Sequence, residues 1–126
     1  MLARVESYDG TTLRVAAPLN PNLNHHETAF GGSIATLAIL AGWSLLHVAL
    51  TESEVSARLM VQKISLEYLR PLDGDFEAVA AKTADTAEFV TAIKRKRKGR
   101  GALHVDVMCN GRCCAKLEGH YVALAE

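Results

Sequence analysis

Residues 28–51 contain no Asp, Glu, Lys or Arg. A helix of that length is long enough to cross a bilayer. The segment is rich in small residues, however, including Gly31, Gly32 and several alanines, and no other stretch of the chain is membrane-like. A helix that is apolar on every side can equally form the buried centre of a globular domain. We therefore predict a long buried core helix here and no membrane span.

Composition narrows the class of protein. The 126 residues fit one domain, residues 1–126, and 14 basic side chains balance 14 acidic ones, which excludes a generally basic nucleic-acid-binding protein. Three cysteines, two of them adjacent, do not make a secreted disulfide framework. Glu6 precedes any apolar run, so we expect no signal peptide. A cytoplasmic globular domain is the expectation.

The remaining elements are predicted as strands and one short helix. Strands are expected at 2–7, 12–17, 59–70 and 76–82, followed by a short helix near residues 86–97 and a hairpin at 102–109 and 113–124. The short helix would start at Asp85 or Thr86 and align Phe89, Ala92, Ile93 and Lys96 on one side. A single helix can be buried among antiparallel strands only if the sheet curls around it. This α+β architecture is the hotdog fold.

The register of the C-terminal hairpin follows from its side-chain faces. A two-residue turn at Asn110-Gly111 would mix apolar and charged residues on each face. A three-residue loop, 110–112, instead pairs Val105 with Leu117, and it places Asp106 opposite Lys116. Because a slip of one residue inverts a whole strand, we predict the longer loop.

The segment 22–33 has the richest chemistry in the chain. Polar side chains crowd before a helix that begins with two glycines, and a helix start offers unpaired amides and a positive dipole end. Glycine lets a substrate carbonyl approach the backbone closely. One interpretation is therefore an oxyanion hole formed by the amides near Gly31 and Gly32, with Asn24 or His25 nearby. The alternative is a helix-capping loop whose glycines serve only close packing.

Longer motifs in this chain resemble a known family. The segment 22–33 reads N-x-N-x-x-x-T-A-F-G-G-S, and it is followed by A-G-W, K-I-S-L-E-Y-L-R-P-L-D-G-D-F and E-G-H-Y-V-A. Together these resemble a bacterial hotdog "putative thioesterase" domain that also occurs fused behind a GNAT acetyltransferase domain. The resemblance implies a homodimeric enzyme, with a tetramer left open, that acts on acyl-CoA or acyl carrier protein. Coenzyme A or phosphopantetheine would enter only as part of the substrate, and no cofactor or metal is expected. Residues expected to bind substrate are Asn22, Thr28, Phe30, Ser33 and Tyr68.

Departures from the wider superfamily bear on the mechanism. Many hotdog thioesterases resemble N-x5-H-G-G-x6-[DE], in which the helix acid activates water. Asn24 and the two glycines match this pattern, but Phe30 stands where His is expected and Ile39 where the acid is expected. Counting from His25 to the helix acid of hotdog dehydratases also reaches Ile39.

This missing acid separates three possible functions. Hydrolysis needs a general base, typically worth about 10²–10⁴-fold in rate, which only His25, His26, Glu27 or Glu67, the last from either subunit of a dimer, could supply. Some relatives are malonyl-ACP decarboxylases, and that reaction needs no base, only stabilisation of the enolate oxygen. A non-catalytic acyl-binding or scaffold protein is the third possibility.

A cationic run lies late in the sequence. Residues 94–100 hold six Lys and Arg side chains, including Lys96, Arg97, Lys98 and Arg100. This run is either a solvated helix end or a docking patch for coenzyme A phosphates or an acidic carrier protein. The cysteines lack a second ligand cluster and do not predict a zinc site.

Overall fold

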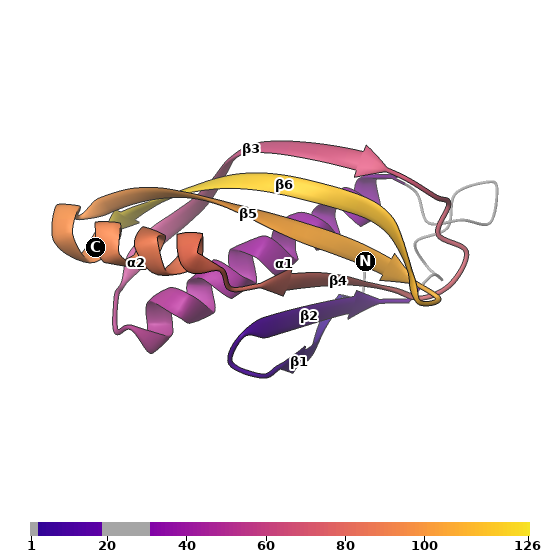
Figure 1. Cartoon of the computed structure of the whole chain (residues 1–126), viewed down its shortest axis with the longest axis horizontal. Helices are drawn as coiled ribbons and strands as arrows, with labels where there is room; N and C mark the ends of the chain where they lie inside the picture. Colours follow the sequence, from indigo (N-terminus) through magenta and orange to yellow (C-terminus); the bar gives the residue numbers. More distant parts are fainter. Residues whose placement is uncertain (1–2, 19–30) are drawn as a thin grey trace.

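The computed structural model describes residues 3–18 and 31–126 (Figure 1). Its elements are β1 (Arg4–Tyr8), β2 (Thr12–Ala17), α1 (Gly31–Glu52), β3 (Ala57–Tyr68), β4 (Phe76–Ala81), α2 (Ala84–Lys96), β5 (Lys98–Cys109) and β6 (Arg112–Ala125). The predicted order of strands and helices is confirmed. β1 begins two residues later than predicted, and β3 begins and ends two residues earlier.

The six strands form one antiparallel sheet in the order β1-β2-β4-β5-β6-β3, which curls over α1 (Figure 1). Alternate side chains of each strand face the helix. On β5, Val105 and Val107 are fully buried against the core, whereas His104 and Asp106 point to the outer face and are exposed. The fold is the hotdog fold, of α+β class, as predicted.

Helix α1 is the core helix of the domain, but the sheet does not cover all of it. It is long and apolar enough to cross a bilayer, and half of its most apolar window is buried inside the protein. Leu37, Ala41 and Leu45 are completely buried, whereas Leu40 is 39% exposed and Trp43 is partly exposed. The prediction of burial on every side is therefore wrong for a single chain, because the sheet leaves the flank of α1 beside the edge strand β3 open.

The N-cap of helix α2 lies two to three residues before the predicted start at Asp85 or Thr86. Thr83 is the N-cap, and it exchanges side-chain and backbone hydrogen bonds with Thr86 in a capping box. The side that packs on the protein consists of Thr86, Phe89, Val90 and Ile93. Lys96 is exposed, so the side predicted to align Phe89, Ala92, Ile93 and Lys96 is buried only in part. The buried side also includes Val90, which the prediction left out, whereas Ala92 is half-buried.

The hairpin satisfies both of the preferences that seemed to conflict. Val105 lies opposite Leu117 and Asp106 opposite Lys116, as predicted. The loop is nevertheless the two-residue turn, because Cys109 pairs with Arg112 and both turn residues have positive φ. A register shift between Val107 and Met108 absorbs the extra residue. The predicted three-residue loop is therefore wrong, although the strand register that motivated it is correct.

Candidate functional site

The start of α1 opens into a pocket of about 450 Å³. Its walls come from the first turn of α1, the end of β3 and the segment that follows β3, and they consist of Gly31, Ile34, Tyr68, Leu69, Arg70, Pro71 and Leu72. Apolar side chains make up most of the lining. The predicted helix-start glycine thus borders a largely apolar cavity whose volume lies in the range of small-molecule sites.

One hydrogen bond ties the edge strand to the helix start. The Tyr68 hydroxyl donates to the Gly31 carbonyl oxygen at 2.9 Å. That carbonyl and the amide N–H of Gly32 belong to the same planar peptide group, so holding the oxygen also orients the N–H. A hydrogen bond to the oxygen further polarises the peptide. Tyr68 can therefore position the Gly32 amide as an oxyanion donor.

The electrostatics of the helix start favour a negative charge. The first turn of α1 has no acidic side chain, so the unpaired amides and the positive end of the helix dipole are not neutralised from within the helix. Gly31 and Gly32 are both exposed, and neither carries a Cβ that would hold a substrate oxygen away. This arrangement can stabilise a negative charge on an oxygen atom placed beside the helix start.

The segment after β3 is held against β6. The amides of Leu69 and Arg70 both donate to the Cys114 carbonyl, at 2.8 and 3.1 Å, and the Arg70 guanidinium donates to the Cys113 carbonyl at 2.8 Å. These bonds shape one wall of the pocket. Arg70 was not among the predicted site residues, because its contact with the pocket depends on how the segment after β3 folds back on β6.

Five of the predicted site residues lie outside the described part of the chain: Asn22, Asn24, His25, Thr28 and Phe30. His26 and Glu27, two of the candidate bases, lie outside it as well. Of the predicted residues within it, Gly31 and Tyr68 line the pocket, and Ser33 is buried in the first turn of α1.

The fourth candidate base, Glu67, does not face this pocket in its own chain. Glu67 lies opposite Lys116 on β6, and Tyr68 lies opposite Ala115. Because consecutive strand residues point to opposite faces, Glu67 stands on the outer face of the sheet. Ile39, which stands where the resemblance to hotdog thioesterases predicted an acid, is half-buried in α1. Within the described residues, therefore, no carboxylate lines the pocket.

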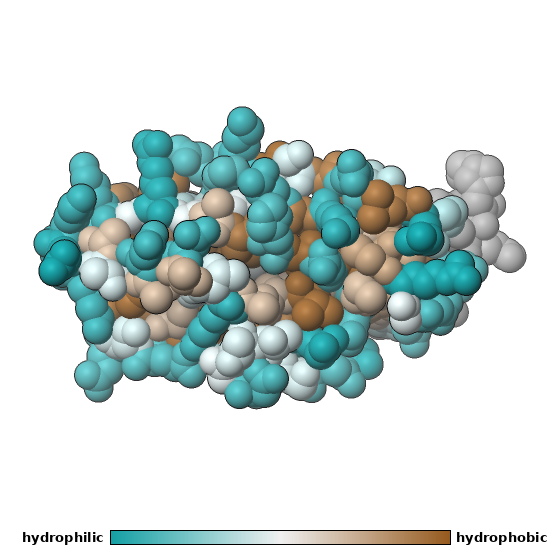
Figure 2. Space-filling view, in the orientation of Figure 1, coloured by the Kyte–Doolittle hydropathy of each residue, from teal (hydrophilic) through white to brown (hydrophobic). Residues whose placement is uncertain are grey.

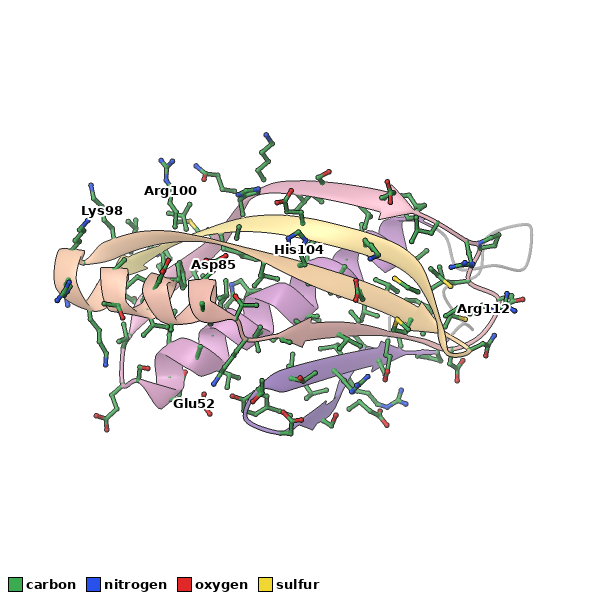
Figure 3. All side chains as sticks on the ribbon, viewed as in Figure 1. Glu52, Asp85, Lys98, Arg100, His104 and Arg112 are labelled. Carbon is green, nitrogen blue, oxygen red and sulfur yellow. The ribbon has the colours of Figure 1, made fainter. Side chains whose placement is uncertain are left out.

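The predicted cationic run lies at the other end of the molecule. Helix α1 spans about 33 Å from end to end, and Lys98 and Arg100 lie toward the end of the molecule where α1 finishes at Glu52, opposite the end where α1 begins (Figure 3). Lys96, Lys98 and Arg100 are exposed. Arg97 instead adopts a left-handed backbone conformation after α2 and donates to the Glu126 carbonyl. In one chain these cations are too far away to contact a group bound in the pocket itself.

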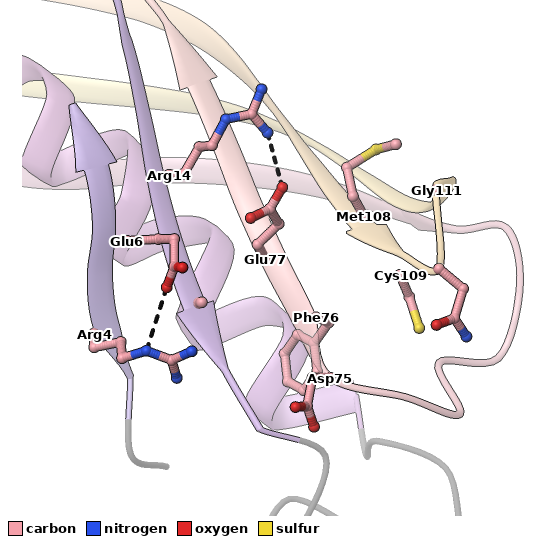
Figure 4. A pocket seen from close by; sticks show the side chains of 11 residues that line it. Arg4, Glu6, Arg14, Asp75, Phe76, Glu77, Met108, Cys109 and Gly111 are labelled. Carbon is pink, nitrogen blue, oxygen red and sulfur yellow. Dashed lines mark hydrogen bonds and ion pairs between the residues drawn. The ribbon is translucent and has the colours of Figure 1, made fainter. Parts of the chain in front are cut away.

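A second hollow, of about 460 Å³, lies beside β1, β2 and β4 (Figure 4). Its charged side chains neutralise one another: Arg14 pairs with Glu77 at 2.8 Å, and Arg4 pairs with Glu6 at 3.3 Å. In the described ranges, 3–18 and 31–126, no group of three or more His, Cys, Asp or Glu could hold a metal ion. Cys109, Cys113 and Cys114 are free thiols.

Comparison with known proteins agrees with this geometry. The family model described as "Putative thioesterase (yiiD_Cterm)" matches residues 1–125. A crystal structure of the putative thioesterase from Shewanella oneidensis is 30% identical, with a TM-score of 0.92 over 98% of this chain and 85% of that one. A Chlorobaculum tepidum protein described as of unknown function is 29% identical, with a TM-score of 0.93 over 98% and 83%.

A more distant likeness concerns the fold alone. A thioesterase from Haemophilus influenzae is 12% identical, with a TM-score of 0.76 over 98% of this chain and 78% of that one. The family match extends over both the pocket at the start of α1 and the predicted loop before it. The chain therefore belongs to the putative thioesterase family of hotdog-fold proteins.

Proposed function

We propose that this protein is a cytoplasmic enzyme that acts on the thioester of an acyl-CoA or an acyl carrier protein, with thioester hydrolysis as its reaction. The observation that carries the proposal is the pocket beside Gly31, where Tyr68 holds the first peptide of α1. The thioester carbonyl would accept hydrogen bonds from the Gly31 and Gly32 amides and from Asn24. These donors stabilise the negative charge that develops when the carbonyl is attacked.

Hydrolysis requires a base for the attacking water, and His25 is our candidate, with His26 and Glu27 as alternatives. Glu67 of the same chain is excluded from this role because it stands on the opposite face of the sheet from Tyr68. Asn22, Thr28, Phe30 and Ser33 would complete the substrate site around the helix start. Beyond the coenzyme A or phosphopantetheine of the substrate, the proposal needs no cofactor and no metal.

Decarboxylation of a malonyl thioester is the second candidate function. The pocket is lined by no described carboxylate, and it contains the Arg70 guanidinium, which can bind the free carboxylate of a malonyl group. The C–C bond to the carboxylate then breaks, carbon dioxide leaves, and the electron pair passes to the enolate, whose oxygen the helix start would stabilise until its carbon takes a proton from water. A non-catalytic acyl-binding protein would retain the same pocket without turning over any thioester.

The working unit in this proposal is a homodimer formed through the edge strand β3, with a tetramer left open. The inner face of β3 exposes Val61, Ile64 and Tyr68, which are 42%, 37% and 53% accessible, and Leu40 of α1 is exposed nearby. An edge strand with such an apolar face is a ready template for pairing with another chain. A second copy would cover both the strand and the open flank of α1.

The residues of β3 favour one antiparallel register with a second copy. Full overlap of residues 57–68 places Arg58 opposite Glu67 of the partner subunit, which is a favourable charge pair. It also places Val61 opposite the partner's Ile64 on the inner face. In this register each inward-facing side chain lies opposite an inward-facing side chain of the partner strand. The register shift between Val61 and Lys63 reverses the inward–outward alternation at the same point in both strands, so the match holds on either side of it.

This pairing also gives the cationic run a place in the mechanism. Antiparallel pairing brings the far end of one protomer toward the Gly31 end of the other. The exposed Lys96, Lys98 and Arg100 of each chain would then lie on the side of its partner's pocket. There they would bind the phosphates of coenzyme A or the acidic surface of a carrier protein. Arg97, in contrast, donates a hydrogen bond to the Glu126 carbonyl of its own chain.

One mass-spectrometric assay separates the three functions. Malonyl, acetyl and long-chain acyl thioesters, each on coenzyme A and on carrier protein, are incubated with the purified protein. Free thiol indicates hydrolysis, an acetyl thioester from malonyl indicates decarboxylation, and unchanged substrates would refute both enzyme proposals. Asn24→Ala is expected to lower turnover by about 10²–10³-fold, with Asn20→Ala as the matched control. Full turnover by Asn24→Ala with every substrate would overturn the role of Asn24.

A further inference from the structure

The outer face of the sheet over β3, β6 and β5 is divided by charge. Three neighbouring cross-strand rows hold four cations, one histidine and no carboxylate: Arg58–Leu124–Lys98, Met60–Val122–Arg100 and Lys63–His120–Ala102. The next two rows, Ser65–Glu118–His104 and Glu67–Lys116–Asp106, hold three carboxylates and one lysine. One half of this face is therefore basic and the other half mainly acidic.

The basic half contains a hollow of about 700 Å³. Its lining residues are Gln62, Lys63, Arg100, Gly101, Ala102 and His120. Gly101 and Ala102 provide a floor without long side chains, and the lysine and arginine rise from the two strands that flank β6. Figure 2 shows hydrophilic side chains projecting from the molecule in the orientation of Figure 1, and Figure 3 labels Arg100 toward the α2 end of the molecule.

The cations of this hollow have no protein partners in the described part of the chain. The ion pairs there join Arg4 to Glu6, Arg14 to Glu77 and Lys82 to Glu52. Lys63 and Arg100 belong to none of them. The hollow beside β1, β2 and β4 (Figure 4) also contains arginines, but glutamates in the same hollow neutralise them. In the outer-face hollow the lining residues include no carboxylate, so its positive charge is uncompensated.

From these observations we infer that the outer-face hollow is a binding site for a phosphate-bearing small molecule of nucleotide size; because Arg100 is also one of the cations proposed above to dock coenzyme A, this inference rests in part on the proposed function. Arg100 presents a planar guanidinium that can bind two phosphate oxygens at once, Lys63 adds a second positive charge, and the His120 imidazole can donate an N–H. The volume lies in the range of small-molecule sites, about 300–1,000 Å³. The hollow is distinct from the pocket at Gly31, because Lys63, Arg100 and His120 point to the outer face and Tyr68 to the inner one.

Isothermal titration calorimetry with ADP and with inorganic pyrophosphate tests this inference on the full chain. The expected result is saturable binding that weakens as salt is added. Lys63→Gln and Arg100→Gln should each weaken binding by about tenfold or more, because each removes a charge-assisted contact to phosphate. Binding of ADP but not pyrophosphate would identify the nucleoside as part of the ligand, and comparable binding of both would identify the phosphates alone; both results support the site.

Lys116→Gln is the matched control, since it removes a lysine from the same outer face within the acidic half. The affinity of the Lys116→Gln variant for ADP and pyrophosphate should stay within about twofold of the wild-type value. The inference is overturned if neither probe binds saturably, or if the control weakens binding as much as Lys63→Gln. It is also overturned if an acidic carrier protein binds through these residues while ADP and pyrophosphate do not. All three substitutions are at exposed positions, and circular dichroism verifies that each variant is folded.

Discussion

Replacing Gly42 by alanine tests how tightly the core helix packs on the sheet. Gly42 is buried in the middle of α1, and the Tyr121 side chain from β6 comes up against it. The Tyr121 hydroxyl donates to the Ile39 carbonyl at 2.9 Å. A Cβ on residue 42 would lie 2.5 Å from that hydroxyl oxygen and 3.0 Å from a methyl carbon of Leu103. The first distance is far below van der Waals contact, so the tyrosine must move.

The magnitude follows from three terms. In an open helix, Gly→Ala stabilises by about 1 kcal/mol. Here overpacking of the core should cost about 1–3 kcal/mol, and displacing the Tyr121 hydroxyl should cost about 1 kcal/mol for its hydrogen bond. The expected net effect of Gly42→Ala is therefore a loss of about 1–3 kcal/mol of unfolding free energy. The sign is opposite to that expected from helix propensity.

Urea unfolding at fixed protein concentration measures this loss, followed by circular dichroism and by the fluorescence of the single tryptophan. Gly42→Ala combined with Tyr121→Phe should recover about 1 kcal/mol relative to the sum of the single effects, because the conflicting oxygen is gone. The recovery is partial, since the tyrosine ring carbon Cζ would still lie 3.1 Å from the new Cβ. Thr36→Ala, on the exposed side of α1, serves as control. A Gly42→Ala protein as stable as the wild type would refute the packing described here.

Three further predictions concern the site, the core and the dimer edge. Tyr68→Phe should lower kcat by about tenfold while changing KM little, because it releases the Gly31 carbonyl without altering the pocket wall; Tyr8→Phe is the control, and equal kcat values would exclude a positioning role. Burial raises the pKa of Tyr121 to about 12, above its ordinary value of about 10. The neutral Tyr121 hydroxyl therefore contributes its full stabilisation below pH of about 10, and this contribution is lost as the pH rises toward about 12. Urea titrations across that pH window should show the free-energy difference between wild type and Tyr121→Phe becoming smaller. Ile64→Arg should convert the proposed dimer to monomers in sedimentation experiments, whereas Ser65→Arg on the outer face should not, and an unchanged dimer in both would place the interface elsewhere.

Local patterns were sufficient to predict most of the fold. The charge-free run of residues 28–51 predicted the core helix, and the alternation of Lys63 to Tyr68 predicted which side of β3 faces inward. The hairpin register followed from keeping apolar side chains on one face. These predictions succeed because burial of alternate or periodic side chains acts over each whole element, and a wrong face would expose many apolar groups at once.

The errors arose where two local preferences competed. Asn110 and Gly111 favour a two-residue turn, whereas the strand faces require one more residue, and a bulge near Met108 satisfies both. Likewise, Thr83 caps α2 in place of Asp85 or Thr86, because Thr83 and Thr86 form a capping box that begins two to three residues earlier. Such choices depend on the energies of alternatives that differ little, and strand alternation alone does not rank them.

Composition and periodicity were enough to establish a curled antiparallel sheet around one apolar helix that starts with two glycines. Tertiary structure alone decided that Tyr68 bonds to Gly31, residues 37 positions apart in the chain, and that Glu67 points away from the pocket beside them. It also decided that Lys63 and Arg100, from strands on either side of β6, share one hollow. These contacts join segments that are far apart in the chain, so they depend on how the strands pair and where they bulge. No local pattern in the sequence specifies the pairing or the bulges.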